Sequence, residues 1–252
     1  MPKCFIKTRW IVFWFFWALA SLAGIPAASA QEGPLNPEAL LLKYKPVLAP
    51  ETFKALLKLE LERSGRPAKH YQVALWQKNP GLVRLLFEAP PSEKGKILLK
   101  KKDNYFLALP DLGEVIQLPP SRISDWGFFY AENLFPFYFQ KDLDWGPVQP
   151  KGDQWTIAIK RKADQALWIS CTLAAPEGPV TRVALFDPSG KEIRTVSIDW
   201  EGAPPIERPK RMAVENHFPE PYRARIRIED LRLKPVFPAP AFEIDLPRPM
   251  EK

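Results

Sequence analysis

The chain has 252 residues, of which 36 are Lys or Arg and 29 are Asp or Glu, so its formal net charge is +7. Three of the basic residues and no acidic residue fall within positions 1–30, and the remaining chain carries +4, too weak and dispersed a charge for a nucleic-acid-binding protein. Cys4 lies in the same stretch, so removing it leaves Cys171 alone and excludes an internal disulfide.

Residues 1–30 have the pattern of a secretory signal peptide. A basic start precedes the apolar run Ile11–Gly24, and Ala28-Ser29-Ala30 supplies the small residues of a cleavage site. The run has 14 residues, whereas a membrane-spanning helix needs about 20. An uncleaved anchor is the alternative. We expect cleavage after Ala30 and a soluble periplasmic chain, residues 31–252, that forms a single domain.

A short helix is expected near the start of this mature chain. Asn36-Pro37-Glu38 combines an N-cap side chain with proline at the first helical position. The pattern predicts about two turns over Ala39–Lys45. Pro46 and Pro50 are expected to end the helix.

From Phe53 onward the apolar residues recur with a period of two, which is typical of half-buried strands. Within residues 53–62 only Leu56 breaks the alternation, and a helix is conceivable there, but the alternation favours a strand. Short strands of this kind, separated by turn residues such as Asp187-Pro188-Ser189-Gly190, continue to residue 231. They predict about eleven strands in an antiparallel meander.

Two features of these strands bear on function. Arg223, Arg225 and Arg227 occupy alternate positions of one strand and therefore point to the same side. This row is interpreted as a solvated strand face, with a docking surface for acidic head groups or an acidic partner as the alternative. Cys171 shares a face with Ile169 and Leu173 and is expected to be a small buried apolar residue.

The segment Trp126–Phe139, called the aromatic segment below, does not fit a plain sheet. Eight of its 14 residues are aromatic and it lacks a period of two. Each aromatic side chain has about 150–250 Å² to bury, so the segment is expected to pack across the sheet as a loop or short helix. It is either a plug of the core or a flap over an apolar cavity.

A sheet of about eleven strands twists and curls. With apolar residues on one side of nearly every strand and few helices to cover them, two outcomes remain. Either two sheets close on each other as a sandwich, or a curved sheet closes over an apolar ligand.

Motifs between residues 83 and 134 favour the second outcome. They are Val83-x-Leu85-x-Phe87-x-x-Pro90, Lys94-Gly95-Lys96-x-Leu98-Leu99, Tyr105-Phe106-x-x-x-Pro110 and the stretch Ser124–Leu134. Together with Pro209-x-Arg211, Ile226-x-Ile228-x-Asp230-Leu231 and Phe242 they resemble the outer-membrane lipoprotein-sorting proteins, in particular a LolA-like branch. Gly127 and Phe128 are additional to the family pattern, and Asn133 stands where the family has Asp.

The resemblance implies a mainly β fold: a curved antiparallel half-barrel with a short helical or loop lid over an apolar cavity. It implies a non-catalytic periplasmic carrier that binds the acyl chains of a lipoprotein or lipid and moves them between an inner-membrane exporter and an outer-membrane acceptor. The candidate lipid-binding residues are the apolar rows of two strands and the aromatic segment: Leu57, Leu59, Leu61, Tyr71, Val73, Leu75, Trp126, Phe128, Phe129, Phe135 and Phe137.

The sequence lacks the motifs HExxH, GxSxG, CxxC and GxGxxG, and its two histidines, His70 and His217, have no partners at metal-ligand spacing. Asp142 and Asp144 are assigned to a turn, since a calcium loop needs more oxygen ligands. No cofactor or metal is therefore expected. A structural or adaptor protein of an envelope export complex is the alternative to the carrier, and an envelope hydrolase is a third hypothesis.

Overall fold

The computed structural model describes residues 35–119, 129–202, 207–218 and 220–244. All of them belong to the compact unit that begins at Leu35. The helices are α1 (Pro37–Leu48) and the single turn α2 (Ala131–Leu134), with 3-10 turns η1 (Pro110–Leu112), η4 (Pro136–Tyr138) and η5 (Ala239–Phe242). The strands are β1 (Phe53–Arg63), β2 (Arg66–Asn79), β3 (Leu82–Ala89), β4 (Ile97–Lys101), β5 (Asn104–Leu109), β6 (Glu114–Leu118), β7 (Leu143–Trp145), β8 (Gln149–Lys151), β9 (Gln154–Arg161), β10 (Leu167–Leu173), β11 (Val180–Phe186), β12 (Glu192–Glu201), β13 (Arg208–Asn216) and β14 (Tyr222–Leu233).

These strands form one antiparallel sheet of 14 strands, with β6 and β7 at the ends of the strand order and β8 paired to β9. The first and last strands, β1 and β14, are neighbours in the middle of the sheet. The connection between β6 and β7 therefore begins at one end of the strand order and finishes at the other. This topology brings residues 129–139, the described part of the aromatic segment, across the sheet.

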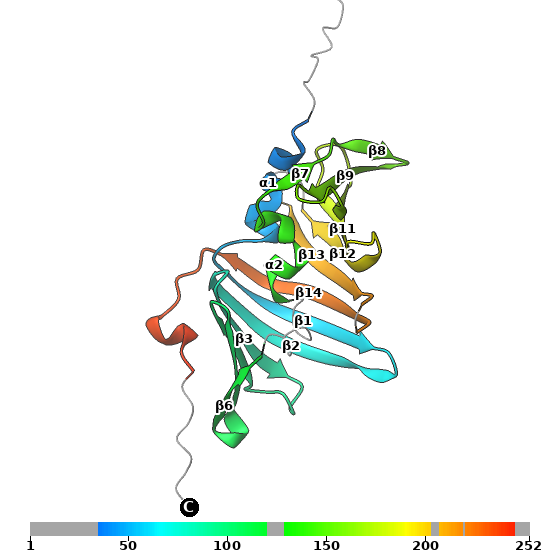
Figure 1. Cartoon of the computed structure of the whole chain (residues 1–252). Helices are drawn as coiled ribbons and strands as arrows, with labels where there is room; N and C mark the ends of the chain where they lie inside the picture. Colours follow the sequence, from blue (N-terminus) through cyan, green and yellow to red (C-terminus); the bar gives the residue numbers. More distant parts are fainter. Residues whose placement is uncertain (1–34, 120–128, 203–206, 219, 245–252) are drawn as a thin grey trace, which may run out of the picture. The chain divides into compact units, whose positions relative to one another are not determined.

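One face of the sheet, the inner face, carries α1 and α2 (Figure 1). Phe53, Ala55, Leu57, Leu59 and Leu61 of β1 are buried on it, and the intervening side chains are more exposed. Leu57 stands opposite Val73 of β2 and Ile228 of β14, so the apolar rows of adjacent strands merge into one core. The alternation that predicts strands thus also builds the core of the inner face.

The break in the β1 pattern coincides with an irregularity of the sheet. The pairing of β1 with β14 shifts register between Lys54 and Leu56, and Leu56 stands opposite Glu229. Leu56 points to the opposite, outer face, where it is half-buried. The strand prediction for this stretch is confirmed.

Helix α1 begins as the sequence predicts but continues past Pro46. The side chain of Asn36 accepts hydrogen bonds from the amides of Glu38 and Ala39, at 3.0 and 3.2 Å. The expected stop at Pro46 is wrong, because the helix ends at Leu48. Proline so close to the end removes one amide donor, and the extra turn buries Leu48 against the core.

The described part of the aromatic segment, residues 129–139, consists of the short helix α2 and the 3-10 turn η4 on the inner face. Phe129, Tyr130, Phe135, Phe137 and Tyr138 are buried there in the same cluster as the strand side chains. The expectation of a short helix or loop packed across the sheet is confirmed for these residues.

The outer face carries a second, smaller core. Ile97, Leu99 and Ala108 are buried there under Ala241 and Phe242, with Trp76, Leu86 and Phe106 packed around them. Arg84 donates hydrogen bonds to the carbonyl oxygens of Ala241, at 2.7 Å, and Glu243, at 3.3 Å. The proline-rich tail is therefore anchored on β2–β5 through the turn η5.

The fold class predicted from the sequence is confirmed: the protein is mainly β, with a single large, curved, open antiparallel sheet and a helical covering on its inner face. Two sheets packed as a sandwich are not observed in the described residues. The strand patterns miss β7 and β8, which have three residues each and show no alternation. Asp142 has a left-handed backbone, consistent with a turn, but Asp144 lies within β7. Among the described residues, no helix has the length and apolar character needed to cross a bilayer.

Candidate functional site

An apolar cavity of about 60 Å³ lies between the inner face, the end of α1 and the aromatic segment. Its sheet side is built by β1, β2, β13 and β14, because the pairing of β1 with β14 places the two ends of the meander next to each other. Apolar side-chain atoms form most of the surface of the cavity. The lining residues are Val47, Leu48, Pro50, Phe53, Ala55, Leu57, Leu75, Phe129, Leu134, Phe135, Pro209, Met212, Ile226, Ile228 and Leu231.

Four of the candidate residues named from the sequence meet at this cavity: Leu57, Leu75, Phe129 and Phe135. Leu59 and Val73 are buried in the same core without lining the cavity. Leu61 and Tyr71 lie farther along the strands, where they line a separate, more polar pocket of about 200 Å³ with Arg63, Arg66, Pro67, Lys69 and Glu93.

The remaining candidates belong to the aromatic segment. Phe137 is buried, with its ring centroid 4.3 Å from that of Tyr138 and 6.4 Å from that of Trp145. Trp126 and Phe128 lie outside the described residues. The segment thus reaches the cavity through Phe129, Leu134 and Phe135, while Phe137 packs beside it.

Sequence reasoning missed the lining residues of the last two strands and of α1, among them Leu48, Met212, Ile226 and Ile228. The alternation of residues 223–231 indicated an apolar face that includes Ile226 and Ile228. It did not indicate that this strand pairs with the first one, so these residues could not be assigned to the same site.

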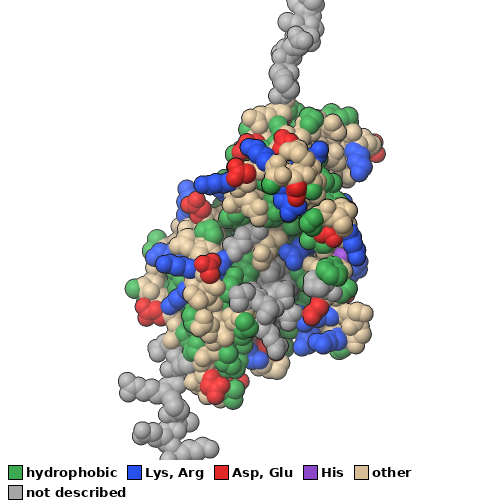
Figure 2. All heavy atoms as spheres, in the orientation of Figure 1, with side chains coloured by type: hydrophobic (Ala, Val, Ile, Leu, Met, Phe, Trp, Pro, Cys, Tyr) green, Lys and Arg blue, Asp and Glu red, His purple; other side chains and the backbone are tan. Residues whose placement is uncertain are grey.

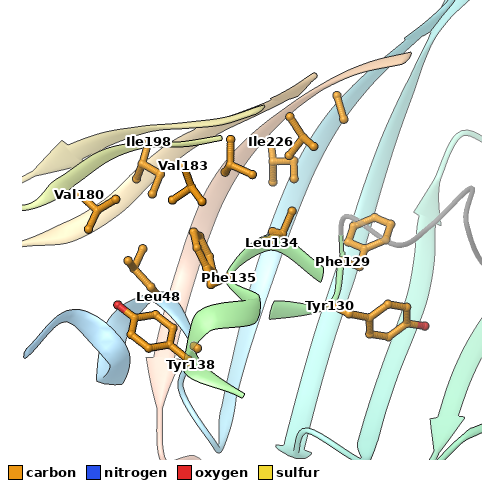
Figure 3. Packing of buried hydrophobic residues seen from close by; sticks show 14 of the residues in the cluster. Leu48, Phe129, Tyr130, Leu134, Phe135, Tyr138, Val180, Val183, Ile198 and Ile226 are labelled. Carbon is orange, nitrogen blue, oxygen red and sulfur yellow. The ribbon is translucent and has the colours of Figure 1, made fainter. Parts of the chain in front are cut away.

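The aromatic segment is held mainly by apolar packing. Phe135 and Leu134 point from it toward the sheet, near Ile226, and Tyr138 lies beside Leu48 (Figure 3). The Tyr138 hydroxyl donates a 2.7 Å hydrogen bond to the carbonyl oxygen of Leu41 in α1. The Arg194 guanidinium donates a 3.1 Å bond to the carbonyl oxygen of Asn133.

Cys171 and Lys100 are two buried ionisable residues of the described inner face. The Cys171 thiol is fully buried, and burial raises its pKa, which keeps it protonated and unsuited to nucleophilic attack, in agreement with the apolar role expected from the sequence. The ammonium of Lys100 lies 5.9 Å from the ring centroid of Tyr105 and 5.3 Å from that of Tyr130. Lys100 and Tyr105 lie on β4 and β5, Tyr130 directly precedes α2, and Cys171 lies on β10. None of these four residues lines the cavity.

The two histidines lie away from the cavity. His70 stands opposite Glu60 in the pairing of β2 with β1, and His217 is 3.4 Å from Glu192. The described residues contain no group of three His, Cys, Asp or Glu side chains arranged to hold a metal ion. On the side of the molecule seen in Figure 2, basic and acidic side chains are interspersed with apolar ones.

Comparison with known proteins identifies the fold. No family model matches the sequence. The sporulation protein YdcC of Bacillus subtilis is 28% identical over 75 residues, which are 30% of this chain, and the chain spans only 21% of that protein's length.

Solved structures match over most of the chain. A LolA superfamily protein of Nitrosomonas europaea matches with a TM-score of 0.61 and 14% identity, covering 83% of this chain and 98% of that one. A domain assigned to outer-membrane lipoprotein sorting, from Vibrio parahaemolyticus, matches with a TM-score of 0.58 and 14% identity, covering 82% and 96%. A DUF1329 family protein of Desulfovibrio piger matches with a TM-score of 0.58 and 14% identity, covering 83% and 98%. The chain thus has the fold of the LolA-like, outer-membrane lipoprotein-sorting proteins that its sequence motifs resemble.

Proposed function

We propose that this protein is a non-catalytic periplasmic carrier that binds the acyl chains of a lipoprotein or lipid on the inner face of its sheet. The observation that carries the proposal is the apolar cavity between β1, β2, β13, β14, α1 and the aromatic segment. All the described side chains that line the cavity are apolar, which suits hydrocarbon chains of varied structure better than a polar substrate.

The energetics favour such a ligand. Each methylene group moved from water into an apolar environment contributes about 0.8 kcal/mol, so an acyl chain of about 16 carbons offers roughly 12 kcal/mol. The cavity of about 60 Å³ is well below the roughly 300–1,000 Å³ of ligand pockets. Binding of a whole chain therefore requires the aromatic segment or α1 to move away from the sheet.

The contacts of the aromatic segment indicate that this displacement costs little free energy. Residues 129–139 belong to no strand of the sheet, so their movement breaks no backbone ladder. Phe129, Leu134 and Phe135 contribute apolar contacts that an acyl chain in the same place would replace. When cargo enters, the acyl chain takes over the apolar contacts that the aromatic segment makes with the sheet. Because one set of contacts replaces another, the net affinity for cargo stays moderate enough for its release.

The carrier proposal includes export and two partners. Residues 1–30 are proposed to be a signal peptide removed after Ala30, and residues 31–252 a single carrier domain in the periplasm. Cargo would be received from an inner-membrane exporter and delivered to an outer-membrane acceptor. N-terminal sequencing of the protein recovered from the periplasm should begin at Gln31.

The test is lipid binding by a variant with a filled cavity. Ala55 lines the cavity on β1, and Ala55→Leu should fill part of it. We expect about tenfold weaker binding of an apolar fluorescent dye, because excluding about two methylene groups costs roughly 1.6 kcal/mol. Lipid extraction and mass spectrometry of the purified full chain should show acyl lipids in the parent and less in the variant.

Ala74→Leu is the matched control, since Ala74 is half-buried on the outer face of β2 and does not line the cavity. Equal dye binding by the parent, Ala55→Leu and Ala74→Leu, with no co-purifying lipid, would reject the carrier. Stable capture of a protein partner by such a lipid-free chain would support the adaptor instead.

A further inference from the structure

The outer face of the sheet carries a row of like charges across adjacent strands. Arg227 of β14 stands directly opposite Lys58 of β1 on one side and Arg211 of β13 on the other. Gln72 and Asp199 continue the row at its two ends. Like charges directly opposite each other destabilise a sheet, so this arrangement opposes folding instead of assisting it.

Acidic side chains near the row neutralise it only in part. Lys58 and Arg227 share the carboxylate of Glu229, at 3.2 and 3.4 Å. Arg211 forms no ion pair within the described residues, although Asp199 stands opposite it across β12 and β13. The Glu229 carboxylate thus pairs with both Lys58 and Arg227, whereas Arg211 has no ion-pair partner among the described residues.

The row lies in a groove of about 730 Å³, a volume typical of binding sites. The groove crosses β3, β2, β1, β14, β13 and β12 on the outer face of the sheet. The apolar cavity lies on the opposite, inner face, and Met212 and Ile226 contribute to both linings. Small side chains, Ala89, Ser197 and Ala213, lie among its lining residues. Its charged lining residues are Lys58, Arg211, Arg225 and Arg227 against Glu60 and Asp199, and Arg225 is paired with Glu60 at 3.1 Å.

We propose that this groove binds an extended acidic segment of a partner protein. Arginine guanidinium groups form paired hydrogen bonds with carboxylates, and aligned carboxylates would neutralise the row. The row from Gln72 to Asp199 crosses five strands and is about 19 Å long, which five or six extended residues match. A concave groove admits a single chain, whereas a bilayer presents its head groups on a flat surface. The site is independent of the apolar cavity and of the carrier proposal.

The test uses a fluorescein-labelled hexaglutamate peptide and the full chain, with fluorescence anisotropy as the readout. We expect saturable binding at low salt that weakens between about 50 and 500 mM NaCl, because salt screens charges at an exposed site. The double variant Arg211→Gln/Arg227→Gln should bind about tenfold more weakly, as expected for two exposed charge pairs. Its melting temperature should be unchanged or slightly higher, because a repulsive contact has been removed.

Arg223→Gln is the matched control: Arg223 is on the same strand and face, is paired with Glu215 at 2.8 Å, and does not line the groove. It should bind the peptide like the parent. The proposal is overturned if the peptide does not saturate, if Arg223→Gln weakens binding as much as the double variant, or if the double variant melts well below the parent. A different result would also overturn the proposal: the parent binds vesicles of anionic phosphatidylglycerol but not the peptide, and the double variant no longer binds the vesicles. That result would assign the groove to a membrane surface.

Discussion

The hydroxyl of Tyr138 donates a 2.7 Å hydrogen bond to the carbonyl oxygen of Leu41, which joins the aromatic segment to α1. Both residues are buried, and burial raises the pKa of Tyr138, so the phenol remains a neutral donor. The bond connects the two coverings of the inner face to each other. They should therefore move together when cargo enters.

Removing this bond should loosen the covering. Tyr138→Phe keeps the ring and loses the donor, and we expect the free energy of unfolding to fall by about 1 kcal/mol. We also expect a higher rate of dye entry in stopped-flow fluorescence. Tyr44→Phe is the control, because the Tyr44 hydroxyl donates to the carbonyl oxygen of Glu177, at 3.2 Å, outside the aromatic segment. Equal dye-entry rates for both variants and the parent would contradict the proposed joint movement.

The C-terminal tail should detach when its anchor is removed. The Arg84 guanidinium carbon lies 5.3 Å from the Trp76 ring centroid, and the side chain donates to two carbonyl oxygens of residues 241 and 243. Phe242 is buried in the anchored tail, and the bond that follows it, to Glu243, is a chymotrypsin site. In Arg84→Gln we expect chymotrypsin to cleave after Phe242 several-fold faster, because cleavage follows the population of the opened tail. Mass spectrometry of timed digests gives the rate.

Arg182→Gln is a suitable comparison for this experiment, since Arg182 pairs with Glu192 at 3.0 Å, away from the tail. Its chymotryptic cleavage after Phe242 should match that of the parent. If the tail of Arg84→Gln is cleaved at the parent rate, the side chain does not anchor it.

The stability of the protein should decline in alkali through Tyr44. Burial, followed by the nearby carboxylates of Glu207 and Glu177, raises the pKa of Tyr44 from 10.0 to about 12. The unfolded chain therefore loses this proton at lower pH than the folded protein does. Stability is at its full value below pH 10 and falls as the pH rises from 10 to about 12.

Melting temperatures measured between pH 8 and 11.5 would check this effect. The parent should lose stability above pH 10, and Tyr44→Phe should lose less over the same interval, because phenylalanine has no proton to release. Parallel pH profiles for the two proteins would exclude a contribution from Tyr44.

The sequence by itself determined the elements and the class of fold. Alternating apolar residues, as in Phe53–Leu61, indicate strands because every second side chain meets the core. Asn36 and Pro37 marked the start of α1, and the aromatic content of residues 126–139 required burial. These properties are local, because each depends only on residues that are close together in the sequence.

Only the tertiary structure decided which elements meet. The pairing of β1 with β14 joins residues far apart in the chain, so Leu57 and Ile228 share a core that no local pattern reveals. The same pairing places Arg227 between Lys58 and Arg211, whereas the sequence showed only one strand of this charge row. The size of the apolar cavity also depends on how α1 and the aromatic segment pack over the sheet. Volume and charge clustering arise from long-range contacts, and a local pattern does not encode them.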